Sequence, residues 1–284
     1  MAEEKSTAIS PLKQFNLVLH NEKTKKYLTD VLGKKAQSYV NNIVALVSND
    51  AKLQVCEPMT LIMAGIKATA LDLPLDNNLG FAYVIPYKNK KEGITVAQFQ
   101  IGYKGFMQLA LRTGLFKHIN VTDVKEGEIV SEDFLSGENV YKRLPATERE
   151  KAKIIGYVAY IELHTGFKKS KYMTVEEVKA HAQKYSQTFK QGYGIWIDNE
   201  ESMALKTPLK LLLSKYAPMS IEIQNAIKYD QSVIKDENDN LEYPDNLPEP
   251  TENAQKFSDD MKAKFGAGTQ TEIPATEYEE IKKD

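Results

Sequence analysis

The stretch from Phe81 to Gly114 limits the possible folds more than any other part of this sequence. Aromatic and β-branched residues fill Phe81–Tyr87, a polar loop follows at Lys88–Gly93, and a second apolar run begins at Ile94, which predicts a β-hairpin. A glycine-bracketed turn then leads directly into a short helix that ends near Gly114. This order places a long hairpin directly before a helix.

The segment Gln98–Gly114, QFQIGYKGFMQLALRTG, has an unusual charge pattern. Lys104, Gln108 and Arg112 recur every fourth position and therefore share one face of the predicted helix, while Phe106 faces another direction. The segment contains no acidic residue, whereas an ordinary exposed helix face mixes both signs of charge. The stripe therefore indicates a polyanionic partner.

The other elements are predicted from apolar spacing, proline positions and capping signals. Pro58 suits the first turn of a helix, because its missing N–H would be unpaired there in any residue, and Pro74 closes that helix. Thr174–Glu177 forms a capping box at the start of another helix. The remaining predicted elements are helices within residues 11–50 with an apolar stripe of Tyr39, Val40, Ile43, Val44 and Val47, a β region from His118, a hairpin of Lys153–Leu163 and Lys168–Met173, and helices at Glu201–Pro218 and Ile221–Tyr229.

The formal net charge of -2 conceals an asymmetry along the chain. Residues 235–284 contain 14 acidic and 6 basic residues, a net charge of -8, which leaves 25 acidic and 31 basic residues in 1–234, a net charge of +6. A basic body with an acidic tail is typical of proteins that bind nucleic acid or regulate that binding; a tail that serves only solubility is the alternative. The tail is expected to be mostly disordered, with one amphipathic patch, Phe257–Phe265, that folds against a partner.

Cysteine and apolar runs indicate the cellular compartment. Cys56 is the only cysteine, so neither an internal disulfide nor a four-cysteine zinc site is possible. The N-terminus lacks the basic-then-apolar order of a signal peptide, and no apolar run approaches the ~20 residues of a membrane helix. We expect a soluble protein of a reducing cytoplasm.

The sequence contains no recognisable catalytic motif. It has neither a phosphate-binding loop of the form GxxxxGK[ST] nor an HExxH pair, and its four histidines are scattered. A metal-dependent DNA nuclease is the main alternative to a protein that only binds nucleic acid. Such a nuclease would need clustered carboxylates to hold its metal ions. The candidate acids lie in a segment that is predicted to be an exposed loop and strand: Asp123, Glu126, Glu128, Glu132 and Asp133. We therefore expect no catalytic residue, no metal site and no cofactor.

Four groups of basic residues remain as candidates for an anion-binding surface. They are the hairpin tip with Lys88, Lys90 and Lys91, the stripe with Lys104 and Arg112, the strand with Lys168, Lys169 and Lys171, and the late helix with Lys206 and Lys210. Thr207-Pro208 interrupts that late helix and allows two interpretations. Either Thr207 caps a new helix whose free N–H groups bind phosphate, or Pro208 kinks a core helix whose lysines are merely solvated.

Aromatic residues are interleaved with these cations, as in proteins that hold single strands by stacking bases and neutralising phosphates. They are Tyr83, Tyr87, Phe99, Tyr103, Phe106, Tyr193 and Trp196. By their phase Phe99 and Phe106 are expected in the core. Tyr103 and Trp196 lie beside glycines and are the better candidates for exposure, although either is also suited to anchoring the core.

Three motifs together resemble the RecT family of phage recombinases, in particular homologues from phages of Gram-positive bacteria. They are NNLGFAYVIPY, then QFQIGYKGFMQLALRTG, and then the glycine-tryptophan loop ahead of MALKTPLKLLLSKYAPMS. The resemblance covers roughly Leu53 to Asp230, in the same order. Two positions depart from the family pattern: Asp72 stands where a glycine is frequent, and Pro208 stands where many members have an aliphatic residue.

The resemblance implies an α+β fold, in which a small antiparallel sheet with a long hairpin packs against several helices. The same resemblance implies an ATP-independent protein that coats single-stranded DNA, anneals it to a complementary strand and assembles into rings or helical filaments. It also implies a partner exonuclease and a contact with the host single-strand-binding protein through the C-terminal region. The expected organisation is a helical region at 1–52 for subunit contacts, a DNA-binding core at 53–234 and the acidic tail at 235–284. The residues expected to bind DNA are Lys88, Lys90, Lys91, Gln100, Tyr103, Lys104, Gln108, Arg112, Trp196, Lys206 and Lys210.

A third possibility belongs to another class. A structural or assembly protein could use the same basic face to bind an acidic protein surface. Salt-dependent capture of a mixed-sequence oligonucleotide distinguishes it from a DNA-binding protein.

Overall fold

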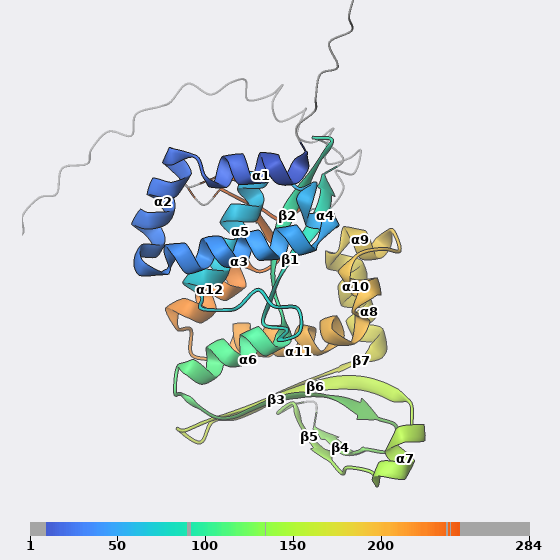
Figure 1. Ribbon diagram of the computed structural model, residues 1–284. Helices are drawn as coiled ribbons and strands as arrows, with labels where there is room; N and C mark the ends of the chain where they lie inside the picture. The colour runs from blue at the N-terminus through green and yellow to red at the C-terminus, as the bar shows by residue number, and fades with distance from the viewer. Residues whose placement is uncertain (1–9, 90–91, 134, 237, 239, 245–284) are drawn as a thin grey trace, which may run out of the picture. The chain divides into compact units, whose positions relative to one another are not determined.

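The computed structural model describes residues 10–89, 92–133, 135–236, 238 and 240–244 (Figure 1). They belong to the first of two units of the chain, 1–247, and the second unit, 248–284, lies outside the described residues. The predictions for Lys90, Lys91 and Phe257–Phe265 therefore fall outside them as well. None of the helices in the described part has both the length and the hydropathy that crossing a bilayer requires.

Helix α5 (Pro58–Ala70) is the central element of the N-terminal half. It starts as predicted, with Pro58 in its first turn, and the Glu57 carboxylate accepts the free N–H of Thr60 at 2.9 Å. Strand β2 (Ile94–Ile101) contacts it, and helices pack around it: α1 (Pro11–Leu19), α2 (Glu22–Leu32) and α3 (Ala36–Asn49), with the short turns η1 (Gly33–Lys35) and α4 (Ala51–Gln54) between and after them. Burial from several directions explains why almost all of α5 is apolar.

Gly65 allows α3 and α5 to approach closely. The predicted stripe on α3 is confirmed, since Tyr39, Ile43 and Val47 are buried and Val40 and Val44 pack partly buried against the same core. The Tyr39 hydroxyl donates a hydrogen bond of 2.7 Å to the Ile62 carbonyl. A Cβ at Gly65 would lie 2.8 Å from the Tyr39 ring, so only glycine fits this position without displacing the ring.

The first sheet has the order β1-β2-β8-β9 and is antiparallel. The predicted hairpin is confirmed as β1 (Ala82–Asn89) and β2, with Ala82 opposite Ile101 and Asn89 opposite Ile94. Two short strands, β8 (Ser232–Ile234) and β9 (Leu241–Glu242), extend it and were not predicted. Lys235, directly after β8, forms ion pairs with Glu242 on β9 and with Glu92 between β1 and β2.

The second sheet has the order β3-β6-β7, also antiparallel. Its strands are β3 (Phe116–Lys125), β6 (Ile154–Leu163) and β7 (Lys168–Thr174), which confirms the predicted hairpin of β6 and β7. A separate hairpin of β4 (Ile129–Asp133) and β5 (Glu138–Tyr141), followed by α7 (Ala146–Lys151), lies next to this sheet and was not predicted as such (Figure 1).

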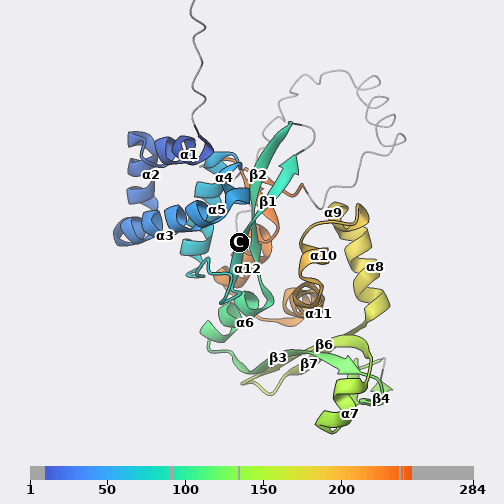
Figure 2. The ribbon, with the colours of Figure 1, turned by 45° about the vertical axis from the view of Figure 1, so that its right-hand side comes forward.

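Helix α11 (Glu200–Tyr216) lies between the two sheets and contacts β6, β7 and α6 (Tyr103–Arg112) (Figures 1 and 2). Its Leu209, Leu212 and Leu213 side chains are fully buried. Around it also lie α8 (Val175–Tyr185), α9 (Gln187–Lys190), α10 (Ile195–Asp198) and α12 (Ile221–Tyr229). The capping box at the start of α8 is confirmed in both directions, between Thr174 and Glu177. With mixed helices and small antiparallel sheets, the α+β prediction is confirmed.

Replacing Gly65 by alanine tests the close contact between α3 and α5. The added methyl group must displace the buried Tyr39 ring, so Gly65→Ala should lower the free energy of unfolding by about 1–3 kcal/mol, measured by urea denaturation. In a Tyr39→Leu background the same change should cost less, because the ring is absent and alanine favours the helix by up to about 1 kcal/mol. An equal cost in both backgrounds would contradict the contact.

Candidate functional site

One face of α11 is the floor of a groove whose lining includes four of the predicted binding residues, Gln100, Trp196, Lys206 and Lys210. Two cavities, of about 20 and 270 Å³, adjoin along this helix and share Met203 and Lys206. We call them together the α11 groove. Its principal lining residues are Tyr83, Gln100 and Gly102 from the first sheet and the turn before α6, His181 and Tyr185 from α8, Trp196 from α10, and Met203, Lys206, Lys210 and Ser214 from α11.

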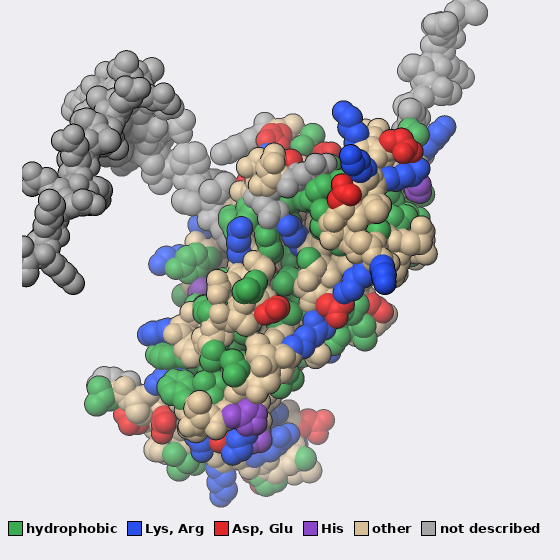
Figure 3. Space-filling view, turned by 90° about the vertical axis from the view of Figure 1, so that its left-hand side faces the viewer, with side chains coloured by type: hydrophobic (Ala, Val, Ile, Leu, Met, Phe, Trp, Pro, Cys, Tyr) green, Lys and Arg blue, Asp and Glu red, His purple; other side chains and the backbone are tan. Residues whose placement is uncertain are grey.

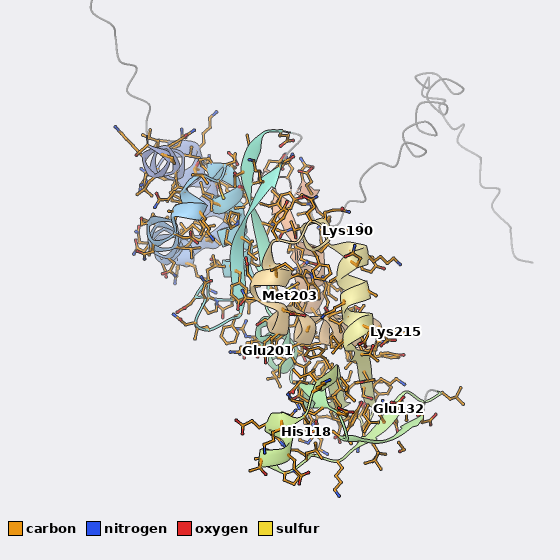
Figure 4. All side chains as sticks on the ribbon, turned by 90° about the vertical axis from the view of Figure 1, so that its right-hand side faces the viewer. His118, Glu132, Lys190, Glu201, Met203 and Lys215 are labelled. Atoms are coloured by element: carbon orange, nitrogen blue, oxygen red, sulfur yellow. The ribbon has the colours of Figure 1, made fainter. Side chains whose placement is uncertain are left out.

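The groove lies between the first sheet on one side and α8 and α10 on the other (Figure 2). Met203 occupies the middle of this region in Figure 4. Among the described residues that line the two cavities, none is acidic. By contrast, cations and acids are interspersed on the face that carries α2 (Figure 3). The α11 groove is therefore suited to an anion, and the α2 face resembles an ordinary solvated surface.

Helix α11 runs without interruption through Pro208, so the interpretation in which Thr207 caps a new helix is wrong. The Thr207 hydroxyl instead donates to the Met203 carbonyl at 2.8 Å, one turn back in the same helix. Pro208 costs the helix one backbone hydrogen bond, and burial of Thr207, Pro208 and Leu209 offsets that cost. Thr207 therefore does not open a helix end whose N–H groups could bind phosphate.

Asp230 binds both lysines of the late helix. Its carboxylate lies 2.7 Å from the Lys206 ammonium and 2.6 Å from the Lys210 ammonium, and it accepts the backbone N–H of Ile101 at 2.9 Å. The Asp230 side chain is fully buried. Two cations and one anion leave this cluster with a net charge of +1, directed at the groove through Lys210, whose side chain is 26% exposed.

Burial and charge act against each other in this cluster. Burial alone would raise the pKa of the Asp230 carboxyl, but the charges of Lys206 and Lys210 outweigh it and hold that pKa below 3.8. Burial lowers the pKa of Lys206 from 10.5 to about 8, although Asp230 opposes the shift. The Lys206 ammonium also lies 5.9 Å from the centre of the Phe106 ring. Lys206 is only 4% exposed, so it is not a solvated surface lysine, and its contact with DNA stays a prediction.

The wall formed by α8 and α10 is aromatic. His181 stacks on Tyr185 at 4.6 Å, and burial, with the nearby charges of Lys210 and Lys184, lowers the pKa of His181 below 6.5. Trp196 packs edge-on against Phe189 at 5.9 Å and is 5% exposed. Exposure of Trp196 was therefore a wrong prediction, and the ring anchors α10 instead.

The stripe on α6 is only partly available to a ligand. Lys104 is exposed beside Gly80 and has no ion pair among the described residues. Gln108 is half-buried. Arg112 donates to the carbonyls of Leu71 and Asp72 at 2.9 and 2.8 Å, so it caps the end of α5. Arg112 therefore has a structural role, and its contact with DNA stays a prediction.

Asp72, which stands where a glycine is frequent, is stabilised by its contact with Arg112. Asp72 has a φ of 53°, a left-handed conformation that glycine adopts most easily and that aspartate tolerates. Its carboxylate forms ion pairs with Lys35 at 3.1 Å and with Arg112 at 3.8 Å. These contacts hold the strained turn in place.

Three other residues that are predicted to bind DNA, Gln100, Tyr103 and Lys88, differ in how far they are buried. Gln100 is 2% exposed; its amide nitrogen contacts the Met203 sulfur at 3.5 Å, and its Oε1 has no hydrogen-bond partner in the described part. Gln100 lines the smaller cavity, and the volume of that cavity, about 20 Å³, suits one water molecule. Tyr103 is half-buried against the core, and Lys88 is exposed on β1. As expected, Phe99 and Phe106 are buried.

Two of the acids considered for a nuclease, Asp123 and Glu128, bind other groups of the fold. Arg149 binds Asp123 and Glu128, each at 2.9 Å, and Glu128 also accepts the N–H groups of Lys125 and Leu144. Across the described ranges, no group of three or more His, Cys, Asp or Glu side chains is arranged to hold a metal ion. These carboxylates stabilise the turns around the β4–β5 hairpin.

Comparison with known proteins gives related sequences for this region. The model of the RecT family matches residues 37–244, which include the whole α11 groove. The uncharacterized protein YqaK of Bacillus subtilis (strain 168) is 39% identical over 238 residues, which cover 82% of this chain and 79% of the relative. Protein RecT of Escherichia coli (strain K12) is 32% identical over 178 residues, 62% of this chain and 64% of that protein.

Replacing Asp230 by asparagine tests the buried cluster. Asp230→Asn leaves two lysines without their anion, so it should lower the free energy of unfolding by about 3–5 kcal/mol at pH 7. Because the folded-state pKa of Asp230 lies below 3.8, its contribution is complete above that pH and is lost as the pH falls through the folded-state pKa. The difference in stability between wild type and variant should therefore shrink only in acid.

Denaturant titrations over a series of pH values measure this difference. Lys206→Met is the matched control, since it keeps the pair between Asp230 and Lys210 and should cost less. A difference between wild type and Asp230→Asn that stays constant far below pH 3.8 would show that Asp230 is not held ionised.

Proposed function

Because the chain belongs to the RecT family, as its three motifs predict, we propose that it is a single-stranded DNA-binding and strand-annealing protein of phage homologous recombination. The observation that supports this most directly is the α11 groove, whose described lining has cations and no acids and lies within the matched residues. A groove of this kind suits a polyanion whose charges repeat along its length.

The groove residues suggest contacts to the DNA backbone. Lys210 is the most accessible cation of the buried cluster, and His181 and Ser214 offer further polar groups near it. Lys104 continues the positive charge next to Gly102, at the other end of the groove. Contacts to phosphates leave the base edges free to pair, as annealing requires.

Annealing by this route needs no nucleotide hydrolysis. Each base-pair step of the product contributes about 1.4 kcal/mol, so pairing itself drives the reaction once two strands are held close together. The protein supplies charge neutralisation and alignment, and Asp230 keeps both lysines in place before DNA arrives. We therefore assign no catalytic residue and no cofactor.

The same proposal extends to the rest of the chain. The helical region 1–52 supplies contacts between subunits in a ring or helical filament, and 53–234 forms the annealing core. The acidic tail, 235–284, docks a partner exonuclease or the host single-strand-binding protein, or competes with DNA for the groove. Its first residues are also part of the fold, since Leu241–Glu242 pairs with β8. The site of action is the cytoplasm of the bacterial host.

Removing the charge of Lys210, which lines the groove, and of Lys104, which lies beside it, tests the role of the groove. Lys104→Gln with Lys210→Gln should make the slope of log affinity against log salt for single-stranded DNA shallower by about 1.4, because two phosphate contacts are lost. Fluorescence anisotropy measures the affinity, and strand annealing should slow in parallel. Lys206 and Asp230 remain as a neutral pair, which protects the fold.

Lys151→Gln with Lys153→Gln is the matched control, since both lysines are exposed, have no ion pair in the described part and lie outside the groove. This pair should bind DNA like the wild type. An unchanged slope in the groove variant would remove the α11 groove from the DNA site. Shortened labelled strands in the presence of Mg²⁺ would instead favour the nuclease alternative.

Shortening the chain tests the tail. A chain ending at Pro244 loses ten acids and five bases and keeps the pairing of β9 with β8. It should bind single-stranded DNA more tightly at low salt and anneal as fast as or faster than the full chain, with the difference vanishing at high salt. The full-length chain with the tail acids changed to amides is the control for length. Loss of DNA binding on truncation would overturn the competing role.

A further inference from the structure

A third cavity lies beyond the end of the α11 groove. It has a volume of about 490 Å³ and is formed by the last turn of α11, strand β7 and the tip of the β4–β5 hairpin. Three lysines and three serines dominate its lining: Lys169, Lys171 and Lys215, with Ser136, Ser170 and Ser214. Among its described lining residues there is no carboxylate.

The lysines of this cavity are gathered around one aromatic ring. The ammonium groups of Lys169 and Lys215 lie 5.5 and 5.1 Å from the centre of the Tyr216 ring, so two like charges are held beside one ring. Lys169 also donates to the Ser136 carbonyl at the hairpin tip. Lys215, in the last turn of α11, is labelled in Figure 4.

The fold balances only part of the charge of this cavity. Lys171 and Lys215 form no ion pair with any described residue. The Asp133 carboxylate, held in the hairpin turn by Leu135 and Ser136, offsets part of the charge of Lys169. Like charges held together without a counter-charge destabilise a fold, and an anionic ligand removes that cost.

The cavity continues the α11 groove. The two share Leu211 and Ser214 in their linings, so they lie next to each other along α11. Lys210 and Lys215 are five residues apart on one helix, which is about 7.5 Å along its axis and about 140° around it, so they serve neighbouring cavities and not one face of the helix.

We propose that Lys169, Lys171 and Lys215 form a second phosphate-binding site, which holds the DNA backbone as it leaves the α11 groove and passes the edge of β7. This inference rests on the proposed function of the groove. Lysine and serine side chains are typical partners of backbone phosphates and carry no base preference. An acidic peptide is the other ligand with matching charge; the three hydroxyls and the continuity with the groove favour the DNA backbone.

Lys171→Gln with Lys215→Gln tests the site and spares Lys169, which holds the hairpin tip. Loss of two phosphate contacts should make the salt dependence of single-strand binding shallower by about 1.4. Over a fourfold rise in salt the variant should therefore lose about 7-fold less affinity than the wild type. The defect should appear with a long mixed-sequence oligonucleotide and diminish with one too short to reach beyond the groove.

Lys151→Gln with Lys153→Gln, which removes the same charge elsewhere, again serves as the control, and thermal melting of both variants checks that they fold. A salt dependence equal to that of the wild type would overturn the second phosphate site. The second phosphate site would also be overturned by another result: the variant binds DNA normally, but it no longer binds a poly-glutamate peptide that the wild type does bind. If the wild type itself shows no salt-dependent binding, the proposed function fails, which is a separate result.

Discussion

The buried carboxylate of Asp230 is the contact on which the groove depends. It lies where α12 ends, and it accepts hydrogen bonds from Ile101 at the end of β2 and from Lys206 and Lys210 on α11. One side chain therefore ties together the first sheet, α11 and α12. A carboxylate without these partners would be costly to bury, and two lysines without it would repel each other.

This arrangement lets the fold present positive charge without exposing all of it. Lys206 stays buried between Asp230 and Phe106, while Lys210 reaches the groove and carries the excess charge of the cluster. Trp196 and the other apolar side chains beneath the groove fix the position of its walls. Because α11 is one uninterrupted helix, it fixes the position of Lys210 in the groove relative to Lys215 in the neighbouring cavity beside β7.

Local patterns in the sequence predicted the elements, and long-range pairing decided the roles of several site residues. The hairpin β1–β2, the start of α5 and the capping box of α8 depend on neighbouring residues, so spacing and propensity were sufficient. Spacing along the sequence could not reveal the contacts of Arg112 and Lys206, because their partners, at Leu71–Asp72 and Asp230, are distant in the chain. Short strands such as β9 have too few residues to show a periodic pattern.

The most direct test of the central claim is an electron cryomicroscopy structure of the protein with two complementary oligonucleotides added in sequence. The account predicts phosphate density along the exposed side of α11, between His181 and Lys210, with the base edges turned away from the helix and toward the second strand. A DNA backbone lying away from α11, for example over the mixed-charge face that carries α2, would contradict it.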